Sequence, residues 1–104
     1  MEKCKITVLK KTFNKELAEE YCSLNLSEHC LGCPLLVVGQ EFIVDNHNQI
    51  PDGFCSWAWG DIQKEVTTIL FGGSFPWIKQ KGVAIACCSD GLMPVIFKIE
   101  KINT

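Results

Sequence analysis

The spacing of apolar and polar residues changes along the chain, and the changes divide it into helices and strands. The longest helical pattern runs through residues 54–73, where apolar side chains recur every three or four positions. A turn signal at residues 51–53 precedes this pattern, and Gly72-Gly73 follows it, where glycine can end the helix in the left-handed conformation. We therefore predict a main helix at about residues 55–71. Its buried stripe consists of Cys55, Trp59, Ile62, Val66, Ile69 and Leu70.

Two residues near the start of this helix carry further expectations. Ser56 is the residue type that caps a first helical turn with its side chain. Gly60 is discordant, because glycine inside a helix is less favourable than alanine by about 1 kcal/mol. A close approach of another backbone at that turn would account for Gly60.

Alternation of apolar and polar residues predicts strands on both sides of the main helix. The strands are expected at residues 3–10, 40–45, 83–88 and 94–102. The last two are joined across Ser89-Asp90-Gly91 as a C-terminal hairpin. The residues predicted to face the core from three of these strands are Cys4, Ile6, Val8, Phe42, Val44, Val95, Phe97 and Ile99.

A second, shorter helix is predicted at about residues 14–22, with Asn14 at its start. The residues that share one of its faces are Leu17, Ala18, Tyr21 and Cys22, and we expect Cys22 to be a small buried apolar residue. Strands at both ends of the chain with helices between them indicate an α+β fold. The sheet should be small, mixed or mainly antiparallel, and able to curl into a partial barrel.

Composition narrows the class of protein. The 104 residues suit a single domain, and 47% of them are hydrophobic, as in ordinary globular proteins. The net charge is −2, and all ten basic residues are lysines. Because arginine supplies much of the recognition of phosphate and guanine, we expect no nucleic-acid partner. No apolar run approaches the ~20 residues of a membrane span, and residues 1–11 lack the apolar core of a signal peptide.

The seven cysteines are the most unusual feature of the composition. An odd number argues against a fully paired secreted framework, so we expect a cytoplasmic protein with free or metal-bound thiols. Cys30-x-x-Cys33 has the spacing of two thiolates that can bind one tetrahedral metal ion. Two idle loop thiols are the alternative. A thioredoxin-like dithiol is less favoured, because no strand precedes the pair.

A pair of cysteines is only half of a metal site, so other residues would have to complete it. The candidates are Cys55, Cys87, Cys88, His29 and Cys22. Cys87 and Cys88 are neighbours on a predicted strand, where successive side chains point to opposite faces. Only one of the two can therefore enter a given site, while the other packs elsewhere.

Trp57 and Trp59 are two positions apart, so on a helix they cannot both face the core. One should be buried, and the other should line a cleft, cover a loop or meet a partner. A tryptophan beside Cys55 at a helix N-terminus would form a ligand pocket. The competing interpretation, which we favour, is packing under the loop that contains Phe75-Pro76-Trp77.

The chain resembles a family of small uncharacterised proteins found mainly in anaerobic bacteria and archaea. The resemblance rests on several segments that span nearly the whole chain. These are residues 5–10, residues 39–44, Gly53-Phe-Cys-Ser-Trp-Ala-Trp59, Phe71-Gly-Gly with Phe75-Pro-Trp77, and Ala86-Cys-Cys-Ser-Asp-Gly91. It implies a stand-alone cytoplasmic domain, and an oxygen-free host would favour retained thiols and a zinc or iron–sulfur site. It implies no particular activity.

These observations lead to three hypotheses of function. The first is a cytosolic domain that binds a metal or a small ligand through cysteines near the N-terminus of the main helix. Cys55, Trp57 and Trp59 are its candidate ligand-binding residues, and its candidate metal ligands are Cys30, Cys33, Cys55, Cys87 and Cys88. The second is a thiol-dependent redox or transfer enzyme that uses Cys55 or the 30/33 pair. The third is an adaptor that docks a protein partner on an aromatic surface.

Overall fold

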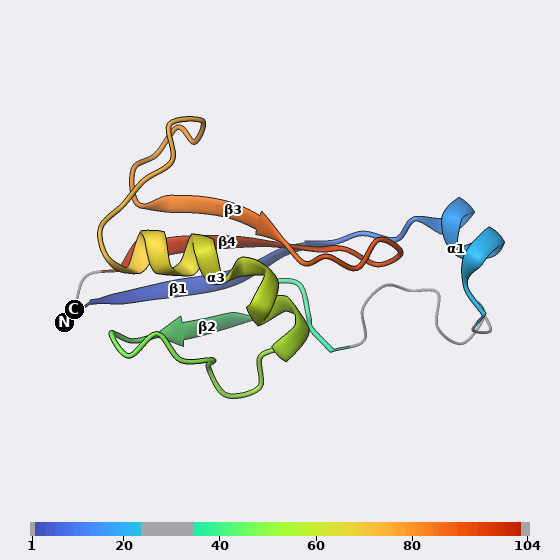
Figure 1. Ribbon diagram of the computed structural model, residues 1–104, viewed down its shortest axis with the longest axis horizontal. Coiled ribbons are helices and arrows are strands. Elements are labelled where there is room, and N and C mark those ends of the chain that lie inside the picture. Colours follow the sequence, from blue (N-terminus) through green and yellow to red (C-terminus); the bar gives the residue numbers. More distant parts are fainter. Residues whose placement is uncertain (1, 24–34, 103–104) are drawn as a thin grey trace.

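The computed structural model describes residues 2–23 and 35–102, which form four strands and two helices (Figure 1). In chain order the elements are β1 (Lys3–Lys11), α1 (Lys15–Tyr21), β2 (Glu41–Val44), α3 (Ser56–Leu70), β3 (Val83–Cys87) and β4 (Val95–Ile102). Every predicted helix and strand is present within a few residues of its expected bounds.

The strands form one open antiparallel sheet in the order β2-β1-β4-β3. β1 and β4 pair at the centre, while β2 and β3 are the two edges. The register of β1 against β4 shifts between Val8 and Lys10, as at a β-bulge. The α+β fold, the mainly antiparallel sheet and the C-terminal hairpin are confirmed. The sheet does not close into a partial barrel.

Helix α3 covers one face of the sheet and buries the predicted stripe (Figure 1). Ile62, Val66 and Ile69 are fully buried, against the inward residues of the strands. Cys55 and Trp59 are only half-buried at the margin of this core. Cys55, rather than Ser56, occupies the N-cap position, and its side chain makes no cap hydrogen bond. The prediction that Ser56 caps the helix is therefore wrong.

Two glycines, one inside α3 and one just after it, differ in backbone conformation and surroundings. Gly72 follows the helix with a φ of +92°, which confirms the predicted left-handed ending at this residue. Gly60 lies on the exposed side of the helix, and a Cβ added there would meet no atom within 4 Å. The expected close backbone approach at Gly60 is therefore wrong.

Helix α1 stands apart from the rest of the fold, at the far end of the extension formed by β1 and the β3–β4 hairpin (Figure 1). Its main-chain link to the hairpin is the amide of Asn14, which donates to the carbonyl of Leu92 at 2.9 Å. Of the predicted face only Ala18 is buried, whereas Leu17 and Tyr21 are exposed. Cys22 is half-buried, because this short helix covers no core. Within the described residues, no helix is long and apolar enough to cross a membrane.

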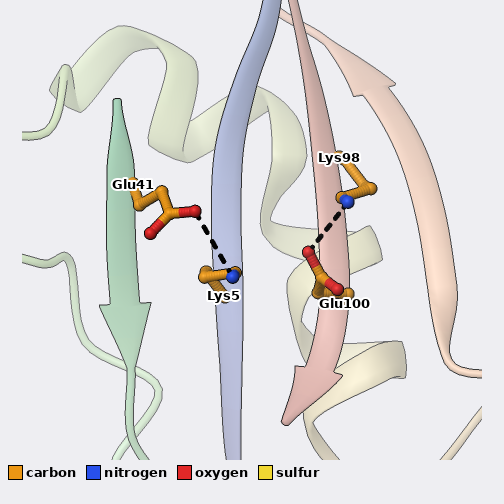
Figure 2. Close-up of polar contacts among 4 residues, drawn as sticks. All are labelled: Lys5, Glu41, Lys98 and Glu100. Atoms are coloured by element: carbon orange, nitrogen blue, oxygen red, sulfur yellow. Dashed lines mark ion pairs between the residues drawn. The ribbon is translucent and has the colours of Figure 1, made fainter. Parts of the chain in front are cut away.

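The face of the sheet opposite α3 carries charged residues of both signs. Figure 2 shows Lys5 of β1 paired with Glu41 of β2 at 3.3 Å, and Lys98 paired with Glu100 along β4 at 3.1 Å. Lys5 is also the register partner of Glu100, so opposite charges alternate across three strands. An antiparallel sheet with one solvated face has this pattern. The sheet therefore has its apolar core on the α3 side alone.

Candidate ligand cavity at the start of the central helix

A half-open cavity of ≈ 240 Å³ lies where the first turn of α3 meets the end of β3 and the start of β4. Three segments that are distant in the sequence form its wall, and they lie within residues 35–36, 55–58 and 88–95. Its lining residues are Leu35, Leu36, Cys55, Trp57, Ala58, Cys88, Asp90, Met93 and Val95. Most of these side chains are apolar, so the cavity suits an apolar ligand contacted by a few polar or polarizable groups.

The start of α3 places Cys55 in this wall. The chain turns at residues 51–54, where Gly53 has a φ of +78° and the amide of Phe54 bonds the carbonyl of Pro51 at 3.2 Å. Cys55 follows in an extended conformation, and its carbonyl accepts the first helical hydrogen bond, from Trp59 at 2.9 Å. The Cys55 thiol makes no cap hydrogen bond, and its side chain lines the cavity.

Strand alternation places Cys88, and not Cys87, in the same cavity. Ala84 and Ala86 face the core, and Cys88 continues on their side as β3 ends. The amide of Val95 donates to the sulfur of Cys88 at 3.3 Å, which holds this side chain against the hairpin. Cys87 is exposed and lies outside the cavity.

The pKa of the Cys87 thiol is raised above its ordinary value of 9.0. Partial burial is the largest cause, followed by the charges of Cys88 and Asp61. A raised pKa lowers the fraction of reactive thiolate near neutral pH. Cys87 is therefore a poor choice for a nucleophile.

The two neighbouring tryptophans have different surroundings. Trp59 is half-buried, with its ring edge-on to Phe54 at 6.2 Å between centroids. Trp57 is 68% exposed at the rim of the cavity, and its Nε1 donates to the Ser89 hydroxyl at 2.9 Å. Trp57 thus lies at the β3–β4 loop rather than under Phe75 and Trp77, which stack on each other at 5.1 Å.

Two aspartates order the loop beside the cavity. The Asp61 carboxylate accepts a hydrogen bond from the Ser89 amide at 2.7 Å and so ties α3 to the loop. Asp90 accepts bonds from the amides of Leu92 and Met93 at 2.9 and 3.1 Å. Asp90 is the turn residue that the sequence predicts, whereas Asp61 is a tether between two elements. This loop keeps Cys88 and Met93 in the cavity wall.

The structure describes some of the proposed metal ligands and not others. Cys30 and Cys33, as well as His29, lie outside the described residues. Within residues 2–23 and 35–102, no group of three or more His, Cys, Asp or Glu side chains has the geometry to hold a metal ion. Cys22, at the end of α1, does not line the cavity.

Several residues at the cavity are absent from the candidates that the sequence suggests, notably the wall residues Met93 and Leu36 and the hydroxyl partner of Trp57, Ser89. Leu36 belongs to an apolar run without a recognisable period, so its burial has no local signal. Met93 and Ser89 flank the Asp90-Gly91 turn, and a hairpin there implies that both lie near the end of the preceding strand. Their position beside this turn was the one feature of the sequence that could have indicated these two residues.

Comparison with protein-family models, with characterised proteins and with solved structures gives no match for this chain.

Proposed function

We propose that this protein binds a small, largely apolar ligand in the cavity at the start of α3, in contact with the thiols of Cys55 and Cys88. The observation that carries this proposal is the convergence of the two cysteines on one cavity from separate elements.

The size of the cavity limits the ligand. A drug-sized ligand occupies a pocket of roughly 300–1,000 Å³, and an apolar cavity of about 150 Å³ accepts benzene. A volume of ≈ 240 Å³ lies between these values. The ligand class is therefore a single ring or a short branched chain, with one small substituent.

The wall chemistry supports the same ligand class. Ala58, Met93 and Val95 provide apolar contacts, and the sulfurs of Cys55 and Cys88 are polarizable groups that pack well against aromatic rings. Trp57 at the rim offers an amphipathic ring that can cover a bound molecule while its N–H stays on Ser89. Asp90 is the charged residue of the wall, and its carboxylate can orient a donor on the ligand.

A titration with benzene, followed by amide chemical shifts in NMR, tests this proposal. Benzene should produce saturable shifts at Cys55 and Ala58. Cys55→Leu should abolish them by filling the cavity, whereas Cys87→Leu, which changes a neighbouring thiol outside the wall, should leave them intact. Shifts that fail to saturate, or that persist in Cys55→Leu, would contradict the proposal.

A metal is the second candidate, and one observation favours it. Cys55 and Cys88 supply two of the four ligands of a tetrahedral site, and Leu35, which follows Cys33 by two residues, lines the same cavity. Consecutive residues span at most ~3.6 Å each, so Cys33 is connected by a short tether to this wall. Cys30 and Cys33 are the proposed remaining ligands, for zinc or an iron–sulfur cluster.

Elemental analysis of protein purified without oxygen separates the two candidates. A thiolate site should yield stoichiometric zinc or iron, and Cys33→Ser and Cys88→Ser should each lose it together with part of the stability. Cys87→Ser is the matched control and should retain the metal. Metal-free wild-type protein would remove this candidate and leave the apolar ligand.

We further propose that the protein works in a reducing cytosol. Among the described residues, Cys4, Cys22, Cys55, Cys87 and Cys88 are all free thiols. Free thiols persist where glutathione and thioredoxin keep them reduced. Retention of the benzene-dependent shifts with dithiothreitol, and their loss after oxidation with oxidised glutathione, would support this setting.

A further inference from the structure

Among the described strands, none pairs with the outer edge of β3. The amide of Lys101 bonds the carbonyl of Gly82 at 2.8 Å, and the amide of Cys88 bonds the carbonyl of Val95 at 3.1 Å. Hydrogen-bonded and non-hydrogen-bonded residue pairs alternate along an antiparallel pair of strands. The backbone N–H and C=O groups of Ala84 and Ala86 therefore also point towards β4. The N–H and C=O groups of Val83, Ile85 and Cys87 therefore point away from the sheet, and no hydrogen bond within the described residues reaches them.

The β3 edge lacks the features with which proteins usually block strand pairing. Those features are charges, prolines and bulges on the edge strand. β3 reads Val-Ala-Ile-Ala-Cys, with Ile85 46% exposed and no charged residue. The opposite edge strand, β2, begins with Glu41 and is followed by Asp45. The two edges of the sheet therefore differ in their ability to accept another strand.

An aromatic pair extends the apolar surface beside β3. Phe75 and Trp77 pack against each other with their ring centroids 5.1 Å apart, and they line a small hollow together with Glu65, Ala84 and Ile85. Phe75 is half-buried, whereas Trp77 is 74% exposed. Large apolar side chains grouped at an open strand edge are typical of an interaction surface.

We infer that β3 pairs with β3 of a second copy of this chain, antiparallel about a two-fold axis at Ile85, so that the two sheets become continuous. In this register Val83 lies opposite the partner's Cys87, and Ala84 lies opposite the partner's Ala86. A two-fold axis places only the residues beside it next to their own copies, so a charge close to the axis would repel its counterpart in the second copy. β3 has no such charge.

The charges at the two ends of β3 are complementary under the same symmetry. Lys79 and Lys81 precede the strand, while Asp90 follows it and Asp61 is hydrogen-bonded to Ser89 just beyond its end. An antiparallel pairing brings the positive end of one strand to the negative end of the other. These charges favour a second copy of the chain over an uncharged or parallel-running peptide.

Sedimentation velocity over a range of concentrations tests the dimer. Wild-type protein should associate, and Ile85→Lys should shift the dimer dissociation constant upward by at least tenfold, because it places two ammonium groups at the axis. Ile43→Lys is the matched control: Ile43 is 48% exposed on the other edge strand and should leave the association unchanged. A monomeric wild type, or equal effects of the two variants, would overturn the inference.

A disulfide test checks the register independently of stability. Facing residues of a hydrogen-bonded antiparallel pair have Cα atoms about 5.5 Å apart, within the range that a disulfide spans. Val83→Cys treated with oxidised glutathione should therefore yield a covalent dimer through the native Cys87. Adding Cys87→Ser should remove that product. A dimer in solution without this cross-link would overturn the proposed register.

Discussion

The indole Nε1 of Trp57 donates a hydrogen bond to the hydroxyl of Ser89, so the first turn of α3 is joined to the loop that follows β3. One turn later, Asp61 accepts a hydrogen bond from the amide of the same serine. Ser89 is thus held by α3 through both its side chain and its main chain. The cavity lies beside this double connection, and its shape depends on it.

Asp61→Ala should therefore lower the free energy of unfolding by about 1 kcal/mol, the usual effect of losing one hydrogen bond. The variant should also loosen the β3–β4 loop and increase amide exchange at Ser89. Chemical denaturation and hydrogen exchange measure the two effects. Asp52→Ala, an exposed turn position, is the control and should change neither. Unaltered exchange at Ser89 in Asp61→Ala would argue against the tether.

Gly60→Ala should stabilise the protein by about 1 kcal/mol, because Gly60 lies inside α3 with open space around its Cα. For a domain of this size the melting temperature should rise by roughly 4–8 °C. Differential scanning calorimetry measures the change. Gly72→Ala is the contrasting variant and should destabilise, since a φ of +92° is strained for alanine. A lower melting temperature for Gly60→Ala would show that the position has another role.

Val66→Asp should unfold the domain. Val66 is fully buried between α3 and the sheet, and an unpaired carboxylate there would lose its hydration without gaining a partner. The penalty of several kcal/mol is comparable with the whole stability of a small domain. Circular dichroism with heating measures it. Lys64→Asp, at an exposed position of the same helix, should melt within a few degrees of wild type. A native melting curve for Val66→Asp would contradict the placement of α3.

Cys4 makes the stability depend on pH under alkaline conditions. Burial in β1 raises the pKa of its thiol from 9.0 to about 11. Below pH 9 the thiol is neutral in both the folded and the unfolded chain, so it contributes no pH dependence. Between pH 9 and about 11 only the unfolded chain releases the proton, and stability falls as pH rises.

Denaturation with urea at about pH 8.5 and about pH 10.5 measures this effect. Wild-type protein should lose roughly 2 kcal/mol more than Cys4→Val over that interval, since each pKa unit corresponds to about 1.4 kcal/mol. All other ionisable groups are common to the two proteins, so their effects cancel in the difference. Equal losses in the two proteins would mean that the Cys4 thiol ionises freely in the folded state.

The strands and the main helix could be predicted because each has one face buried in the core and one face exposed to solvent. Val95, Phe97 and Ile99 alternate strictly, and Ile62, Val66 and Ile69 recur at helical spacing, so each pattern matches one period. The prediction for helix α1 was less successful because this helix packs against little of the apolar core. Leu17 and Tyr21 share a face in sequence, yet that face stays exposed. A local pattern does not show whether a facing surface exists.

The candidate site could be predicted only in part, since it depends on how distant segments meet. Cys55 and Trp57 were candidates from their position at a helix start, and both line the cavity. Alternation separates Cys87 from Cys88, but it does not say which of them faces α3; the pairing of β3 with β4 decides that. Leu36 lines the cavity through long-range packing, and such packing leaves no periodic pattern in the local sequence.

The central position of β1 and β4 has a consequence for the time course of folding. Lys3 and Ile102 are register partners, so the innermost strand pair joins segments separated by almost the whole described chain. Such a high contact order requires a large loop to close before these hydrogen bonds form, which slows folding relative to helical domains. While the chain is being synthesised, Cys4, Ile6 and Val8 have no β4 beside them until that strand leaves the ribosome. The apolar face of β1 therefore remains exposed until β4 has been synthesised, as a surface that a chaperone can bind.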